Sequence, residues 1–421
     1  MFMANKNIFF AHSGGVTATI NTTLSGVLTA YKKNKDFFDH LYVGCNGIMG
    51  AIEEHMVDVS DWDAKAIEAV RTTPGSIFGS CRFKLKDPAK QASEFARILE
   101  VFKTHKIGYF IYNGGNDSQD TTLKISEYCK ANGHPLVCIG IPKTIDNDLA
   151  CTDHTPGFGS AAKYLATSML EASIDLASMS KTSTKVFVLE VMGRHAGWLA
   201  ASTALAPSPY NADVILMPER AFNEKATMAK IKLTVEEKGY CSVAVAEGLK
   251  NSKQEIWSVQ KNNVDAFGHA QLGGVGAQLS QLIQKKLKLK THFAIADYLQ
   301  RSARHIASKV DANEAFALGE EAIKFCKARK TGKMLTIERL SNYPYRSRIK
   351  DTDLENVANK EKLVPDYFIN DDGLNVNTAC IEYLKPLITG EDYPVYHAGL
   401  PNYKSFEKIL VKKQLDAITH L

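Results

Sequence analysis

The chain has 421 residues, which is enough for two or three domains and a sizeable hydrophobic core. Hydrophobic residues make up 45% and charged residues 23% of it, a composition typical of globular proteins rather than disordered or fibrous ones. The net charge of +5 is small for this length, and no block of Lys and Arg with interleaved aromatic residues occurs, which argues against nucleic acid as a partner.

The cysteines and the apolar runs indicate the cellular compartment. The 8 cysteines are scattered and form no Cys-x-x-Cys pair, so we expect free thiols in a reducing environment. Residues 1–7 lack the layout of a signal peptide, and apolar runs such as Val186–Leu189 are far too short to cross a bilayer. We therefore expect a cytoplasmic protein that has no membrane partner.

Short apolar runs alternate with longer amphipathic stretches along the chain. Several of these runs are continuous in Val, Ile and Phe, which is typical of parallel strands covered on both faces. Apolar spacing predicts helices over Gln91–Lys106 and Ser160–Ala177. The alternation predicts an α/β fold with a parallel sheet. The predicted strands are Asn7–Ala11, Leu41–Val43, Ile107–Tyr112, Leu136–Ile141, Lys185–Val191, Asp213–Met217 and Tyr240–Ala246.

The chain has no linker of low complexity, so the domain boundaries come from the order of the motifs. We expect a first domain over 1–155, to which the chain returns over about 290–330, and a second domain over 156–290. Residues 331–421 are more polar and are broken by several prolines. We interpret them as a C-terminal extension that wraps the core.

Two segments near the N-terminus have phosphate-binding character. Ser13-Gly14-Gly15 follows the first strand, and glycines there allow the backbone to approach a phosphate closely. The Thr17–Thr23 stretch can begin a helix whose N-terminus favours an anion. Further on, Arg82, Lys84 and Lys86 form a basic loop that could contact phosphoryl oxygens. The alternatives are an ordinary strand-to-helix turn and a solvated charged loop.

Two more segments follow predicted strands and carry acids. Asn113–Ser118 reads Asn-Gly-Gly-Asn-Asp-Ser, and Pro142–Asp148 reads Pro-Lys-Thr-Ile-Asp-Asn-Asp. Open α/β sheets bind ligands at this edge, although an Asp-Asn-Asp cluster is also a common turn. Lys143, Thr144 and Asp146 together offer a cation, a hydroxyl and a base, which favours a catalytic loop.

Two segments further along the chain could bind a phosphorylated sugar. Met192–Gly197 places Arg194 between glycines at a strand end, which suits a phosphate. Glu247 follows another strand and suits hydroxyl recognition. Alone, either could be a helix cap or a surface residue. His195 and His269 have no partner at metal-ligand spacing, so we expect ordinary hydrogen-bonded histidines.

In this order, the segments resemble the phosphofructokinase family, most closely its pyrophosphate-dependent branch, from about Ile8 to about Arg304. The resemblance implies an α/β fold with two Rossmann-like three-layer domains of mostly parallel sheets, an active site in the cleft between them, and a C-terminal extension. It also implies reversible Mg²⁺-dependent transfer of a phosphoryl group from pyrophosphate to the 1-hydroxyl of fructose 6-phosphate. A homodimer or homotetramer is expected.

The resemblance implies a role for each matching residue. Asp146 would take the proton of the sugar hydroxyl, with Lys143, Asp117 and Arg194 as further catalytic residues, and Asn116 would bind the metal. The residues that would bind the donor are Gly15, Arg82, Gly115, Asp117 and Lys143. The residues that would bind the sugar phosphate are Thr144, Ile145, Asp146, Met192, Gly193, Arg194, Glu247, Tyr298, Leu299, Gln300 and Arg301.

The choice of donor depends on Asp117 and Lys143, which stand where the ATP-dependent branch typically has glycine. A carboxylate at 117 would repel the α-phosphate of ATP, and an ammonium at 143 would hold a pyrophosphate. Like charges a few ångströms apart cost on the order of a kcal/mol near a protein surface. About 1.4 kcal/mol is a tenfold preference, so the pair predicts pyrophosphate as the donor.

The chain departs from the family at several positions. Asn116 replaces the usual aspartate, Lys185 replaces an arginine, and Asn263 and Leu272 stand where arginines are expected in bacterial ATP-dependent enzymes. Lysine does not replace arginine at bidentate phosphate contacts. The departures suggest a different phosphate clamp, formed by Lys185 with Tyr298 and Arg301, and argue against allostery of the bacterial ATP type.

Three other functions remain as alternatives. An ATP-dependent member of the same family would differ in its donor. A non-catalytic regulatory subunit that binds sugar phosphate would be expected to lose the base, whereas Asp146 is present. An α/β protein of unrelated role would need chance to produce all the segments in order. A second sugar such as sedoheptulose 7-phosphate stays open, because it shares the reacting end.

Overall fold

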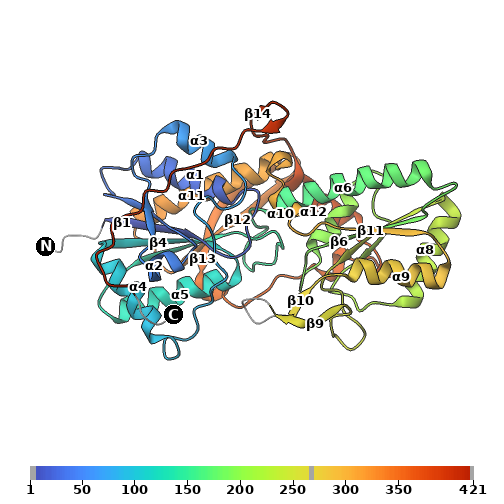
Figure 1. The fold of residues 1–421 in the computed structure, drawn as a ribbon, viewed down its shortest axis with the longest axis horizontal. Coiled ribbons are helices and arrows are strands. Elements are labelled where there is room, and N and C mark those ends of the chain that lie inside the picture. Colours follow the sequence, from blue (N-terminus) through green and yellow to red (C-terminus); the bar gives the residue numbers. More distant parts are fainter. Residues whose placement is uncertain (1–5, 265–269, 418–421) are drawn as a thin grey trace.

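The computed structural model describes residues 6–264 and 270–417. The chain forms two α/β halves side by side, each with helices on both faces of its sheet (Figure 1). The predicted α/β class with mostly parallel sheets is confirmed, and all seven predicted strands form within a residue or two of their expected bounds. The continuous apolar runs are parallel strands, buried on both faces as their composition predicts.

The first domain is built on a seven-stranded sheet. Its strand pairs are parallel except at its two ends, where β2–β3 and β12–β13 are antiparallel. The strand order is β13 (Tyr345–Asp353), β12 (Lys333–Asn342), β5 (Val137–Pro142), β4 (Ile107–Gly114), β1 (Asn7–His12), β2 (Leu41–Gly44) and β3 (Met56–Asp58). The carboxyl ends of β1, β4 and β5 therefore lie side by side.

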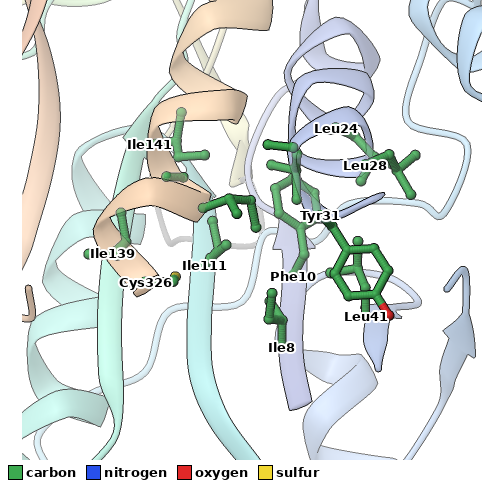
Figure 2. Close-up of a cluster of buried hydrophobic side chains, with 14 of the residues drawn as sticks. Ile8, Phe10, Leu24, Leu28, Tyr31, Leu41, Ile111, Ile139, Ile141 and Cys326 are labelled. Atoms are coloured by element: carbon green, nitrogen blue, oxygen red, sulfur yellow. The ribbon is translucent and has the colours of Figure 1, made fainter. Parts of the chain in front are cut away.

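Two helical layers cover this sheet. One consists of α1 (Ile20–Lys32), α3 (Ala64–Thr72) and α11 (Lys309–Lys327), and the other of α2 (Met49–Ile52), α4 (Ala92–Thr104) and α5 (Asn116–Ala131). Figure 2 shows the apolar cluster under the first layer, which includes Phe10, Leu24, Ile139 and Cys326 of α11. Glycines bring α1 and α11 together: a Cβ on Gly26 would lie 2.0 Å from the carbonyl oxygen of Phe316.

The second domain has a four-stranded parallel sheet in the order β11 (Thr291–Ile295), β6 (Val186–Val191), β8 (Cys241–Ala246) and β7 (Val214–Leu216). Helix α6 (Phe158–Met179) lies above the sheet in Figure 1, and α8 (Glu224–Lys238) and α9 (Val275–Leu287) lie below it. Helix α8 ends at Gly239, whose φ of 86° suits glycine. The shorter elements are α7 (Trp198–Ser202), η1 (Thr203–Leu205), α10 (Leu299–Ser302), η2 (Arg304–Ile306) and the hairpin β9 (Val259–Val264) with β10 (Ala270–Leu272).

The structure corrects two predicted boundaries. The chain returns to the first domain at α11 rather than near residue 290, because β11 pairs with β6 in the second sheet. The extension over 331–421 does not only wrap the core, since β12 and β13 complete the first sheet. The remaining elements of the extension are η3 (Leu354–Asn356), η4 (Asp366–Phe368), α12 (Thr378–Leu384), η5 (Lys385–Ile388), β14 (Tyr396–His397) and β15 (Leu400–Pro401).

The end of the extension lies against the first domain. The Val411 N–H donates to the carbonyl oxygen of Met56 at 2.8 Å. The N–H groups of Gln414 and Leu415 donate to the buried carboxylate of Glu54 at 2.6 and 3.2 Å. Residues 411–415 are therefore part of the first domain's packing. Within the described residues, none of the helices has both the length and the apolar character needed to span a bilayer.

Candidate active site

Three cations surround the glycine turn after β1. The Lys143 Nζ donates to the carbonyl oxygen of Gly15 at 2.6 Å. A Cβ on Gly15 would lie 3.0 Å from Nη1 of Arg301 and 3.7 Å from Nη2 of Arg82. Gly14 has a φ of 74°, which favours glycine, and a Cβ there would lie 3.4 Å from the Lys143 Nζ. The turn, the lysine and both arginines thus form one cationic site from four separate chain segments.

The cationic site brings three basic side chains close together. Lys143 is only 2% exposed, and burial, together with Arg301 and Arg82, lowers the pKa of its ammonium to about 7 despite nearby Asp146 and Asp148. Like charges held close in a partly dry site are costly unless an anion joins them. A ligand with several negative charges would relieve that repulsion and return the lysine to its charged form. The site therefore suits a compact polyanion.

Asp117 lies beside this site, in the first turn of α5. Its Oδ1 accepts from the Lys84 Nζ at 2.7 Å, and both side chains are partly exposed. An acid is favourable at a helix N-terminus. The sequence interpretation treated Asp117 as an isolated negative charge, whereas the structure pairs it with the lysine of the basic loop. Gly115 is the residue immediately before this helix, with an extended φ of −81°.

Asn116, the predicted metal ligand, binds the C-terminal extension. Its Oδ1 accepts from the Asn359 N–H at 2.6 Å, and its Nδ2 donates to the carbonyl oxygen of Lys360 at 2.6 Å. An amide oxygen has a second lone pair that a cation could use. Metal binding by Asn116 stays a prediction.

The loop after β5 carries the predicted base. The Asp146 N–H donates to Thr144 Oγ1 at 3.1 Å, which fixes the turn. Burial raises the pKa of the Asp146 carboxyl, while Lys143, Thr144, Arg82 and His195 act in the opposite direction. Burial and Asp146 also raise the pKa of Asp148 to about 7. Ile145 is 5% exposed and packs in the core of the second domain, so it supports the loop from behind.

The loops after β6 and β8 face the base loop. Gly193 has a φ of 133°, and a Cβ there would lie 2.6 Å from the carbonyl oxygen of Ala196, so only glycine suits this position. Its own carbonyl oxygen accepts from the Gly248 N–H at 3.1 Å, which ties the two loops together. Burial and Asp146 raise the pKa of Glu247 to about 7, against the effect of Arg194. Acids from both domains therefore meet here with an arginine.

The Tyr298–Arg301 segment contributes residues both to the cationic site and to the loop after β6. The Arg301 guanidinium stacks over the Tyr298 ring at 3.9 Å and reaches the glycine turn. Gln300 is buried, and its Oε1 accepts from the Met192 N–H at 3.3 Å, so it positions the sugar-side loop. Tyr298 and Leu299 are 63% and 61% exposed.

Several predicted residues lie elsewhere or outside the described part. The Lys185 Nζ donates to the carbonyl oxygen of Ser180, so it lies at the opposite end of β6 from Met192 and Tyr298. His269 lies outside the described part of the chain, as do the side chains of Asn263 and Leu272. His195 lies 3.6 Å from the Glu361 carboxylate and is close enough to Asp146 to affect the pKa of its carboxyl, so it belongs to the candidate site.

Sequence reasoning missed the contribution of the extension. Asn359 and Lys360 form hydrogen bonds with Asn116 in the segment after β4, Asn113–Ser118, which we call the donor loop. Lys362 forms one with Asn147 in the segment after β5, Pro142–Asp148, which we call the base loop. They lie more than 200 residues from both loops, in a stretch that reads as an ordinary charged surface. No local pattern could have identified them.

Loops that carry cations and acids at the strand ends of two parallel sheets define an α/β phosphotransferase. The family model described as phosphofructokinase matches residues 7–326. The chain is 48% identical over 415 residues to a protein of Halomonas elongata named pyrophosphate–fructose 6-phosphate 1-phosphotransferase, and the match covers 98% of this chain and 99% of that one. A protein of the same name from Methylococcus capsulatus is 47% identical, over 99% of both chains.

A solved structure shows the same fold over the full length. The crystal structure of a pyrophosphate-dependent phosphofructokinase from Nitrosospira multiformis matches with a TM-score of 0.91 and 47% identity, covering 99% of this chain and 100% of that one. The chain therefore belongs to the phosphofructokinase family.

Proposed function

We propose that the protein catalyses the reversible, Mg²⁺-dependent transfer of a phosphoryl group from pyrophosphate to the 1-hydroxyl of fructose 6-phosphate. The observation that carries this proposal is the position of Lys143, whose ammonium lies on the glycine turn beside Arg82 and Arg301. The names of the full-length relatives agree with it. The products are fructose 1,6-bisphosphate and phosphate.

The donor side favours pyrophosphate over ATP. Lys143 takes up the space next to Gly14 and Gly15, and its depressed pKa indicates a site that needs a compact anion with high charge density. Asp117, held by Lys84, adds a carboxylate to the donor side, which we expect to repel the additional phosphate ester of ATP. Phosphate groups bind best where several cations are already in place.

The proposed transfer is a direct displacement. The sugar oxygen forms a bond to one phosphorus of pyrophosphate as the bridging P–O bond breaks, and phosphate leaves with the bond's electrons. Asp146 accepts the proton of the hydroxyl, and burial raises its pKa toward that of a working base. Lys143, Arg82 and Arg194 would offset the negative charge, since phosphoryl transfer depends mainly on positioning and electrostatics.

Magnesium fits the donor side as a metal that is bound together with its substrate. Mg²⁺ usually takes one or two carboxylates plus phosphate oxygens and water. The described residues contain no cluster of three or more His, Cys, Asp or Glu side chains that would form a metal site without substrate. We assign Asp117 as the ligand, with the Asn116 amide oxygen as a second. The metal would supply charge neutralisation of the diphosphate.

The sugar side rests on the facing loops. Arg194, Glu247 and the backbone of Met192–Gly193 form one wall, and Thr144 and Asp146 form the other. We propose that these groups bind fructose 6-phosphate, with Tyr298 at the rim. Arg301 reaches the glycine turn, so we assign it a role in donor binding in addition to the predicted sugar-phosphate contact.

Initial rates with fructose 6-phosphate and Mg²⁺ test the proposal, with pyrophosphate and ATP compared as donors. We expect kcat/KM with pyrophosphate to exceed that with ATP by roughly 100-fold or more, about 3 kcal/mol. Equal rates, or a preference for ATP, would overturn the donor assignment. The Asp146→Asn variant, purified in the same way, reports any contaminating kinase.

The non-catalytic alternative would be supported by sugar-phosphate binding without turnover.

We propose in addition that the protein acts in the cytoplasm as a homodimer or homotetramer. Analytical ultracentrifugation of the purified protein measures that assembly state directly, and a monomer at micromolar concentration would contradict it.

A further inference from the structure

Four consecutive residues of the extension, Asn359–Lys362, contact loops of both domains at the candidate site. We call them the 359–362 clasp. On the donor side, the clasp holds both ends of the Asn116 amide, and Asn359 Nδ2 donates to Asp120 at 3.2 Å. In the base loop, the carbonyl oxygen of Asp148 accepts from the Lys362 N–H at 2.7 Å. The clasp thus joins the loop after β4 to the loop after β5.

The clasp also reaches the sugar side of the site. The Glu361 carboxylate lies 3.6 Å from His195, the residue after Arg194. The carbonyl oxygen of Lys362 accepts from the Trp198 Nε1 at 3.0 Å. A single short stretch therefore contacts the donor loop, the base loop and the segment after β6 that carries Arg194 and His195.

The side chain of Lys362 holds the base loop from within the protein. Its ammonium donates to the carbonyl oxygens of Asp153 and Thr152 at 2.7 and 3.2 Å, and to the Asn147 Oδ1 at 3.3 Å. Asp153, Asp148 and Arg339 are the charged groups around it. Removing an ammonium from water is costly unless hydrogen bonds replace the lost water. The three acceptors supply those hydrogen bonds, and together they fix the position of the Lys362 ammonium.

Asn147 lies between Asp146 and Asp148 and is fully buried. Its φ of 54° is in the left-handed region, where residues other than glycine are uncommon, although asparagine is enriched among them. The extension holds both ends of its side chain in this conformation: the Asn147 Oδ1 accepts from Lys362, and its Nδ2 donates to the Tyr383 Oη at 3.2 Å. Asn147 directly follows Asp146, so fixing its backbone conformation constrains the chain segment that carries the Asp146 side chain.

We propose that Lys362 is a positioning residue for the phosphoryl transfer. By holding Asn147 in its left-handed conformation, Lys362 keeps Asp146 in a fixed position relative to the donor loop, which the 359–362 clasp also binds. The inference rests on the proposed function, because it assigns Lys362 a role in that reaction. Lys362 acts through Asn147 and need not touch either substrate.

The Lys362→Met variant tests the inference, since it keeps the length of the side chain and removes its three donors. Misplacement of a reacting group by about 1 Å costs on the order of 100-fold in rate. We expect kcat to fall about 10- to 100-fold, while KM for both substrates and the Kd of fructose 6-phosphate from calorimetry change less than threefold. The matched control is Lys385→Met, an exposed lysine of the same extension.

The outcomes separate this inference from the proposed function. If the wild-type protein does not turn over pyrophosphate and fructose 6-phosphate, the proposed function fails. If it does, and Lys362→Met keeps its kcat, or loses kcat and sugar affinity together, the positioning role is wrong. If Lys362→Met does not fold, Asn147→Gly decides the question: glycine accepts the same φ without the side-chain contacts and should show the same selective fall in kcat.

Discussion

Lys143 is the residue on which the donor assignment depends most. Its ammonium binds the glycine turn and lies with two arginines in a site whose repulsion lowers its pKa to about 7. Asp117 contributes differently from its sequence interpretation, because Lys84 neutralises part of its charge. We therefore propose that the exclusion of ATP comes mainly from the space and charge at Lys143, with Asp117 as a second contribution.

The double variant Asp117→Gly with Lys143→Gly tests this view. We expect kcat/KM with pyrophosphate to fall at least about 100-fold, because the site loses one of three cations, and the rate with ATP to rise because both side chains vacate the donor side. Steady-state kinetics with each donor gives the comparison. The Lys84→Met variant serves as a control, since it unpairs Asp117 but leaves Lys143 in place. Unchanged kinetics with both donors would contradict the assignment.

Asp146 is testable separately. Asparagine has nearly the same size but cannot accept the proton, so we expect Asp146→Asn to lower kcat by about 100- to 10,000-fold. Binding of fructose 6-phosphate, measured by calorimetry, should change little. Turnover close to that of the wild type would remove Asp146 from the role of base.

At the scale of elements, η2 and the extension are joined by a buried ion pair. Arg304 is fully buried, and its guanidinium binds both the carboxylate and the carbonyl oxygen of Asp392. The same carboxylate accepts from Arg71 at 2.8 Å. Removing one partner of a buried pair leaves an uncompensated charge.

We therefore expect Asp392→Ala to lower the free energy of unfolding by about 3–5 kcal/mol in chemical denaturation. The neighbouring Glu391→Ala is the matched control. Its pair with Lys163 is half exposed, so we expect a loss of at most about 1 kcal/mol. Equal losses in the two variants would show that burial does not set the strength of the pair.

The sequence predicts some elements far better than others. Strands such as β4 and β5 are continuous apolar runs, so their composition identifies them. The edge strand β11 and the hairpin β12–β13, in which β13 is the edge strand, were missed, because most residues of the two edge strands are exposed or polar and fit equally well in a loop. Their place is set by the strand that they join, which lies far away in the sequence.

For the whole molecule, the loops at the strand ends could be predicted to meet, because parallel strands bring their carboxyl ends to one edge. Gly15, Lys143 and Asp146 come together as that rule requires. The contribution of Lys362 could not be predicted, since nothing in its neighbourhood differs from a charged surface loop. Tertiary packing alone brings it to Asn147.

The same packing buries a charged network that joins the extension to the first domain. His154 pairs with Asp153 at 2.8 Å and with Glu314 of α11 at 2.6 Å, and Arg339 of β12 also binds Asp153. Burial alone would lower the pKa of His154, but Glu314 and Asp153 outweigh it and raise the pKa to about 9.

This raised pKa predicts a pH dependence of stability. A histidine with a folded pKa above its unfolded value of about 6.5 stabilises fully below that value and loses the effect as pH rises to about 9. We expect the stability difference between the wild type and His154→Gln to shrink across this window, by about 3 kcal/mol at most. Denaturation at several pH values measures it, with His40→Gln as an exposed control. A constant difference would contradict the assigned network.

The contact of residues 411–415 with Met56 and Glu54 bears on how the protein is made. The ribosome completes the strands around β1 early, whereas β12 and the partners of Glu54 leave the exit tunnel much later. Until those residues emerge, the N-terminal half has an unfinished sheet, and the Glu54 carboxylate lacks two of its hydrogen-bond donors. A nascent chain stalled before residue 411 would remain incomplete there.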